Sequence, residues 1–71
     1  MGQSYRVPKR TVLCIDDDNA ILRYERALLE RSGYNVLTTE SAQQGLTLAM
    51  RPQIDAVVQN YGIKLLRHRD G

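Results

Sequence analysis

Residues 11–18 read Thr-Val-Leu-Cys-Ile-Asp-Asp-Asp, a short apolar run that stops at three acids. The run is rich in β-branched residues and is apolar at every position from Val12 to Ile15, which is typical of a strand buried between parallel neighbours. Ligands of open parallel sheets bind beyond the carboxyl ends of the strands, where Asp16, Asp17 and Asp18 would lie. The stretch therefore predicts a buried strand and a polar site at its end.

A helical pattern follows from about residue 19 to residue 32. Asp18 or Asn19 can cap its first turn by accepting from backbone N–H groups, and Gly33 can adopt the left-handed conformation that ends a helix. Spacings of three and four positions predict the face that packs on the core, which consists of Ile21, Tyr24, Leu28 and Arg31. Ala20, Ala27 and Leu29 broaden this stripe. We therefore expect Tyr24 to lie at the edge of the core.

Two more strands and a second helix are expected further along the chain. Residues 34–39 and 54–58 are short segments with the composition of strands. Ser41 followed by Gln44 fits the capping box that starts a helix, and Pro52 stops that helix. Its narrow apolar stripe would be Ala42, Gly45, Leu46 and Ala49. Helices placed between short apolar strands predict an α/β fold built from parallel, right-handed βαβ units.

Composition limits the class of protein. The chain has 71 residues, of which 42% are hydrophobic and 25% charged, and a single cysteine. These values fit one small soluble domain and exclude an intramolecular disulfide scaffold. No apolar run approaches the roughly 20 residues that span a bilayer, and no secretory signal is visible. We expect a cytoplasmic protein that does not bind membranes.

Charge is distributed unevenly along the chain. The formal net charge of +2 arises from basic ends, because the central part carries four Arg against seven acids. We expect a flexible basic leader over residues 1–9, a domain over residues 10–61 and a divergent basic tail over residues 62–71. Basic ends are also a feature of nucleic-acid binders, so a small basic-tailed nucleic-acid-binding protein is the alternative function. The acidic centre and the lack of a stacking motif count against it.

The acidic cluster has two interpretations. Asp16 and Asp17 provide the oxygen ligands that Mg²⁺ prefers, and close carboxylates repel each other unless a cation lies among them. Acids that precede a helix also interact favourably with the helix dipole and cap its first turn. Each such acid stabilises the helix by about 0.3–1 kcal/mol. We expect Asp18 to be the cap, and Asp16 and Asp17 to be the metal ligands.

Several segments together resemble a known family. They are residues 12–18, Ile21, residues 28–30, the Gly33-Tyr34-Asn35-Val36 step, Gly45-Leu46 and residues 55–58. In this order and at these intervals they resemble the receiver domain of bacterial response regulators, over about residues 10–61. The resemblance implies a doubly wound, flavodoxin-like parallel sheet, truncated here to three strands in the order 2-1-3.

The resemblance also implies a function. Receivers take a phosphoryl group from a sensor histidine kinase or a phosphotransfer protein onto an Asp after the third strand, and they hold Mg²⁺ nearby. By position, Asp17 would bind the metal directly, Asp16 would act mainly through water, and the backbone carbonyl of Gly62 would be a third ligand. Asn60 occupies the phosphoacceptor position, and an amide has no carboxylate oxygen to form an acyl phosphate.

Further departures from the family concern the end of the chain. The Ser or Thr after the fourth strand and the Lys after the fifth strand of receivers have no counterpart, so we expect a truncated or frame-disrupted receiver. Because Asn60 stands where receivers have an Asp, the site lacks one negative charge, which would weaken Mg²⁺ binding. The third strand would become an unpaired edge, through which the chain could associate with itself. We therefore expect a pseudo-receiver that acts in phosphorelay signalling as an interaction module and not as an enzyme.

Overall fold

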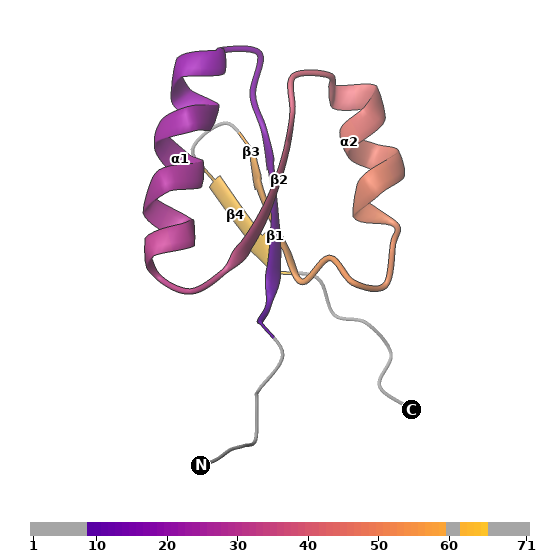
Figure 1. Ribbon diagram of the computed structural model, residues 1–71. Coiled ribbons are helices and arrows are strands. Elements are labelled where there is room, and N and C mark those ends of the chain that lie inside the picture. The colour runs from indigo at the N-terminus through magenta and orange to yellow at the C-terminus, as the bar shows by residue number, and fades with distance from the viewer. Residues whose placement is uncertain (1–8, 60–61, 66–71) are drawn as a thin grey trace.

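The computed structural model describes residues 9–59 and 62–65. Its elements are, in order along the chain, β1 (Thr11–Ile15), α1 (Asn19–Arg31), β2 (Asn35–Thr39), α2 (Ala42–Ala49), β3 (Ala56–Gln59) and β4 (Gly62–Leu65) (Figure 1). Of the expected leader, only Lys9 lies within the described residues. Each helix and each of the first three strands forms close to the range that the sequence predicts.

The sheet has the strand order β2-β1-β3-β4. β1 is central and pairs in parallel with β2 and with β3, in a register that places Ile15 opposite both Thr39 and Gln59. The parallel part therefore has the order 2-1-3, which confirms the expected α/β, flavodoxin-like order of the first three strands.

The fourth strand corrects two expectations. Residues Gly62–Leu65, which were expected to belong to a tail, pair with β3 in the antiparallel direction, with Gln59 opposite Gly62 and Ala56 opposite Leu65. β3 is therefore an internal strand, and the prediction that it forms an unpaired edge is wrong. An open strand leaves its N–H and C=O groups without partners, and a strand that follows after two residues can satisfy them. The outer edge on this side of the sheet is β4.

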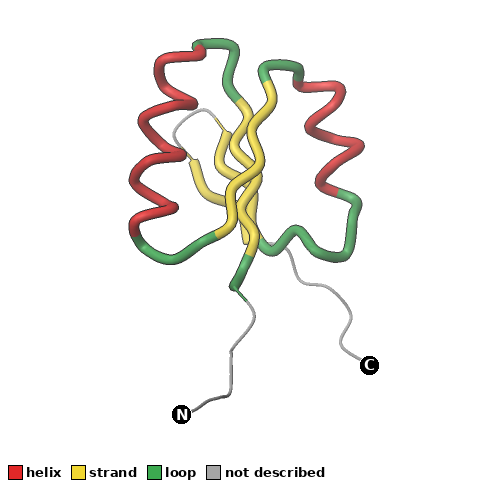
Figure 2. Tube along the Cα trace, viewed as in Figure 1, coloured by secondary structure: helices red, strands yellow, loops and turns green. Residues whose placement is uncertain are grey.

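The helices cover opposite faces of the sheet, and each has its own apolar cluster (Figures 1 and 2). On the α1 face, Leu22 packs with four strand residues, Val12, Cys14, Val36 and Ala56. On the α2 face, Leu48 and Ala49 pack against Leu13, Ile15, Ile54 and Val57. Successive β1 residues thus alternate between the two faces, and all four from Val12 to Ile15 are buried, as their apolar run predicts.

Both helices begin and end as the sequence predicts. The Asp18 carboxylate accepts from the backbone N–H of Ala20, and the Ser41 hydroxyl accepts from the backbone N–H of Gln44. Gly33 follows α1 with a φ of 96°, a conformation that side chains with a Cβ rarely adopt. These local signals depend on a few neighbouring residues, which explains why the sequence alone predicts them.

The predicted packing faces of the helices are partly wrong. In α1, Leu22 is 3% exposed, whereas Tyr24 is 66% exposed and Leu28 is 44% exposed. The packed face therefore runs through Leu22, which the prediction left out, and through Leu29, which it placed at the margin of the stripe. In α2, Gly45 is buried as expected, but Leu46 is 70% exposed. Two overlapping apolar stripes at helical spacing cannot be told apart by period alone.

Candidate functional site

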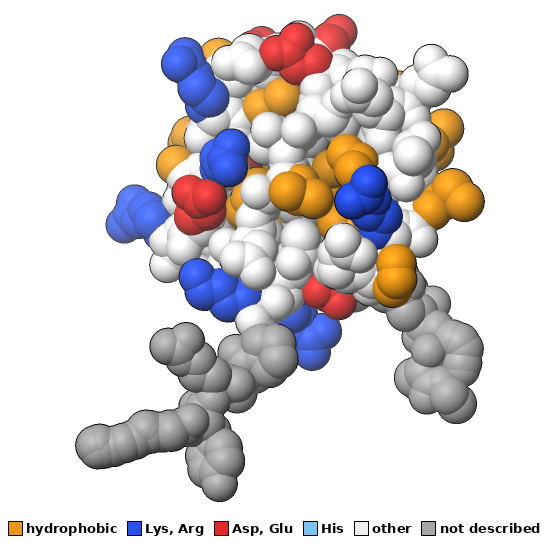
Figure 3. Space-filling model, turned by 45° about the vertical axis from the view of Figure 1, so that its right-hand side comes forward, with side chains coloured by type: hydrophobic (Ala, Val, Ile, Leu, Met, Phe, Trp, Pro, Cys, Tyr) orange, Lys and Arg blue, Asp and Glu red, His pale blue; other side chains and the backbone are white. Residues whose placement is uncertain are grey.

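The carboxyl ends of the parallel strands form a shallow pocket of about 260 Å³. Because Ile15 is level with Thr39 and Gln59, the residues that follow these strands meet at one edge of the sheet. The pocket is lined by Ile15, Asp16, Asp17, Glu40, Ala42 and Gln59. Figure 3 shows acidic side chains at the upper end of the molecule, which is this end of the sheet. The structure thus brings Asp16 and Asp17 together beside the end of β3.

The three acids after β1 have different surroundings. Asp16 is half-buried, its N–H donates to the carbonyl of Thr39 (3.2 Å), and its Oδ1 accepts from the backbone N–H of Asp18 (2.9 Å). Asp18 caps α1 through a 2.9 Å hydrogen bond from the N–H of Ala20. Asp17 is exposed and lines the pocket with Asp16. Asp18 is thus the cap, as expected, whereas the role of Asp16 and Asp17 as metal ligands stays a prediction.

Glu40 is a pocket residue that the sequence reasoning missed. It follows β2, and its Oε2 accepts from Nδ2 of Asn19 (2.8 Å), which links the end of β2 to the start of α1. The signal was present in the sequence, because parallel strands end at the same edge and an acid after β2 must lie near the acids after β1. Glu40 adds a further negative charge beside Asp16 and Asp17.

The rim of the pocket is held by a small hydrogen-bond network. Thr39 Oγ1 accepts from the backbone N–H of Ser41 (3.1 Å) and donates to Oε1 of Gln44 (3.1 Å). In a capping box, the side chain of the third helical residue accepts directly from the backbone N–H of the cap residue. Here the Thr39 hydroxyl bridges the N–H of the cap, Ser41, and the side chain of the third residue, Gln44. The network fixes the start of α2, and with it Ala42, against the end of β2.

Asp16 and Asp17 are the carboxylates that this pocket would offer to Mg²⁺. Two carboxylates that share a pocket with water access suit an ion that keeps several of its waters. Within the described ranges, however, no group of three or more His, Cys, Asp or Glu side chains is arranged to hold a metal. Gly62 begins β4 and is absent from the residues described as lining this pocket, and Asn60 lies outside the described residues. The described part of the pocket thus offers carboxylates but no metal-holding group, and the expected Mg²⁺ site stays a prediction.

Cys14 offers no second reactive centre. Its thiol is fully buried in β1, and burial raises its pKa to about 12, with the negative charge of Glu25 acting in the same direction. Nucleophilic thiols need the opposite surroundings, which favour the thiolate. Glu25 lies in α1, its Oε1 is buried without a hydrogen-bond partner, and desolvation raises its pKa. We therefore assign both residues to the packing of α1 on the sheet.

The fold and the pocket define an α/β domain with an acidic site at the switch point of a parallel sheet, and sequence comparison agrees with the receiver interpretation. The chain is 48% identical over 44 residues to the alginate biosynthesis transcriptional regulatory protein AlgB of Pseudomonas putida, and equally so to its namesake in Pseudomonas syringae. Each match covers 62% of this chain, which spans about 10% of the length of either relative. The similarity supports a response-regulator receiver-like region in this chain.

Other comparisons add little to this. No protein-family profile matches the chain, and no solved structure matches it. Among the helices of the described residues, none is both long enough and apolar enough to cross a bilayer.

Proposed function

We propose that this chain is a receiver-like module of two-component phosphorelay signalling that cannot be phosphorylated at residue 60. It would recognise a sensor histidine kinase or a phosphotransfer protein without accepting a phosphoryl group. One observation carries the proposal, namely that Asp16, Asp17 and Gln59 line one pocket at the carboxyl ends of β1 and β3. Asn60 directly follows Gln59. By the family resemblance, Asn60 occupies the position of the Asp whose carboxylate attacks phosphorus in receivers.

The chemistry of residue 60 determines what the pocket does. A carboxylate oxygen can attack a phosphoryl group and form an acyl phosphate, whereas the amide oxygen of Asn60 is a weak nucleophile. Asn in place of Asp also removes one negative charge of the protein that would otherwise attract a cation in the pocket. Mg²⁺ would be held by Asp16 and Asp17, with the carbonyl of Gly62 as the further ligand that the family resemblance implies. We infer weak metal binding and no catalytic turnover.

The nucleic-acid alternative has less support. It depends on the basic ends of the chain, and of their charged residues only Lys9, Arg10 and the backbone of Lys64 lie within the described residues. The described part of the chain offers no feature that favours it over the receiver interpretation.

Phosphorylation is the direct test. The chain is incubated with acetyl phosphate and Mg²⁺, and its intact mass is measured. We expect no mass increase corresponding to one HPO₃ group. An adduct on residue 60 or on a neighbouring residue would overturn the inactive assignment.

The Asn60→Asp variant tests the location of the site. Restoring the carboxylate should strengthen Mg²⁺ binding, because it adds a negative charge beside Asp16 and Asp17, and it should permit the adduct with acetyl phosphate. Asn35→Asp is the matched control, since it makes the same change at the start of β2, at the opposite end of the sheet. Equal Mg²⁺ affinity of the two variants would show that residue 60 does not face the acidic pocket.

A further inference from the structure

We propose that α1 pairs with α1 of a second copy of this chain, side by side and in opposite directions. The inference rests on the surface of the helix and does not depend on the proposed function. α1 has apolar residues on two faces, and one of these faces packs on the sheet through Leu22 and Leu29. Tyr24 and Leu28, which spacing predicts for the packed face, are exposed instead.

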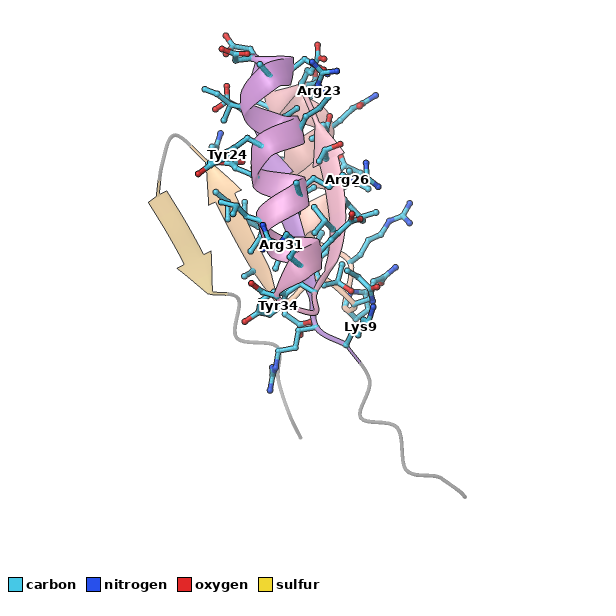
Figure 4. All side chains as sticks on the ribbon, turned by 60° about the vertical axis from the view of Figure 1, so that its left-hand side comes forward. Lys9, Arg23, Tyr24, Arg26, Arg31 and Tyr34 are labelled. Atoms are coloured by element: carbon cyan, nitrogen blue, oxygen red, sulfur yellow. The ribbon has the colours of Figure 1, made fainter. Side chains whose placement is uncertain are left out.

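The exposed apolar residues form a stripe along α1. Tyr24 is 66% exposed and Leu28 is 44% exposed. Ala20 and Ala27 are exposed on the same side, because residues three or four positions apart share one face of a helix. We call these four residues the outer stripe, and Figure 4 shows Tyr24 extending outward from the helix. A second apolar face of this kind is stabilised when another layer reduces its contact with water.

The order of residues in the outer stripe fits a second copy of the same helix. A two-fold axis perpendicular to α1, level with the midpoint between Tyr24 and Ala27, makes the two helices antiparallel. Tyr24 then lies opposite the partner's Ala27, and the same contact is made twice. A small side chain opposite a large one allows two helices to approach closely while the space between them is filled. The stripe is therefore complementary to itself.

The flanks of the outer stripe match in the same arrangement. On one flank, Arg23 comes within about 3 Å along the helix axis of the level of the partner's Glu30. Glu30 also pairs with Arg26 in its own helix (3.2 Å), and a carboxylate can accept from more than one donor. On the other flank, Ile21 comes level with the partner's Leu28. Charged and apolar residues at such flanking positions set the partner and the direction of paired helices.

The two ends of α1 carry opposite charges. Asp17 and Asp18 precede the helix, and Arg31 lies in its last turn. In the antiparallel pair, the acids of each copy lie beside the partner's Arg31. A parallel pair would place like charges together and would also align the two helix dipoles. A partner of uniformly acidic or basic surface would suit only one end, so the charges favour a second α1 in the reverse direction.

The contact is small, so the association should be weak. α1 has 13 residues and is about 20 Å long. Small interfaces are typical of transient complexes, and we expect a dissociation constant between about 10 µM and about 1 mM. Sedimentation at increasing protein concentration measures it. A monomer at every concentration up to about 1 mM would overturn the proposal and leave this face of α1 to a different protein.

Two charge variants test the partner and the direction together. Arg23→Glu and Glu30→Arg each bring like charges together in their own dimer, and each should reduce the association constant about fivefold or more. When the two variants are mixed, every residue 23 meets an opposite charge at residue 30, so association should recover. Recovery would also show that both variants are folded. A mixture that stays dissociated would contradict antiparallel pairing through α1.

Two leucine variants locate the contact. Leu28→Ala removes apolar atoms from the outer stripe and should reduce the association constant about fivefold or more. Leu46→Ala is the matched control, because Leu46 is 70% exposed on α2, which covers the opposite face of the sheet. It should leave association unchanged. A loss at Leu46 without a loss at Leu28 would place the contact on α2.

Amide NMR spectra of the unmodified chain give a measurement that does not depend on how the variants fold. Signals of Ala20, Tyr24 and Ala27 should shift as protein concentration rises, while those of α2 should stay in place. Shifts confined to α2 or to the strands, in a sample that sedimentation shows to dimerise, would exclude α1 as the contact.

Discussion

Asp55 and Thr11 exchange two hydrogen bonds across the start of the sheet. Oδ2 of Asp55 accepts from the backbone N–H of Thr11, and the N–H of Asp55 donates to the carbonyl of Thr11, both at 2.8 Å. The two residues are 44 positions apart in the sequence, and both are half-buried. This pair helps to fix the register of β3 against β1. The register of these strands determines which residues meet in the acidic pocket.

Replacing Asp55 should therefore weaken the domain. Asp55→Ala leaves the N–H of Thr11 without its acceptor, which we expect to lower the free energy of unfolding by about 1–3 kcal/mol. Asp55→Asn keeps an acceptor oxygen and should cost less than the alanine change. Chemical denaturation of the two variants checks this. An alanine variant as stable as the asparagine variant would show that the side-chain bond contributes nothing.

Gly45 allows α2 to approach β1 closely. A Cβ built on Gly45 would lie 2.8 Å from Cγ1 of Ile15 and would also clash with its Cδ1. Gly45→Val should lower the free energy of unfolding by about 1–3 kcal/mol through overpacking. Gly45→Ala should cost less, because alanine gains about 1 kcal/mol of helix propensity and the end of the Ile15 side chain can shift.

The contact with Ile15 predicts coupling between the two positions. Ile15→Val removes Cδ1, so Gly45→Ala should be better tolerated in the Ile15→Val background than in the unmodified chain. A double-mutant cycle measured by thermal unfolding should give a coupling of about 0.5 kcal/mol or more. Strict additivity would mean that the added methyl group does not press on Ile15.

The α1 packing face can be checked by truncating one residue from each candidate stripe. Leu22→Ala removes a buried side chain and should lower the free energy of unfolding by about 2–5 kcal/mol, whereas Tyr24→Ala should cost less than about 1 kcal/mol because Tyr24 is exposed. The measurement is denaturant unfolding at a concentration low enough to avoid association. A larger loss at Tyr24 would support the face predicted from spacing alone.

Glu25 should make stability depend on pH. Desolvation raises the pKa of its carboxyl in the folded state above its ordinary value. As pH rises from the ordinary value to the raised value, the unfolded chain releases its proton first, so stability is lost across this window. Glu25→Met removes the charge and the unpartnered Oε1, and it should raise the free energy of unfolding at pH 7.

The control for Glu25 lies five residues later in the same helix. Glu30 pairs with Arg26 at the surface (3.2 Å), so Glu30→Met should change stability little. The gain from Glu25→Met should shrink as pH falls through the window, because protonated Glu25 no longer carries a partly desolvated charge. A gain that is the same at acidic and neutral pH would show that the charge is not its cause.

Local sequence was enough for the two helices, the first three strands and the place of the acidic pocket. The all-apolar run of β1, the caps Asp18 and Ser41 and the left-handed Gly33 each depend on interactions within a few residues, so their residue types predict them. The grouping of Asp16 and Asp17 followed from the rule that parallel strands end at one edge. Chain order together with this rule therefore located the acidic pocket.

Contacts between distant residues decided the rest. The packed face of α1 depends on how the helix is rotated over the sheet. This rotation buries Leu22 and exposes Tyr24, although each of them has apolar neighbours at helical spacing in the sequence. β4 exists because β3 offers an open side to residues whose own pattern is weak, and this pairing gains its energy only once β3 is in place. Sequence determines a local structure whose stabilising partners are near in the chain; only tertiary packing determines one whose partners are far away.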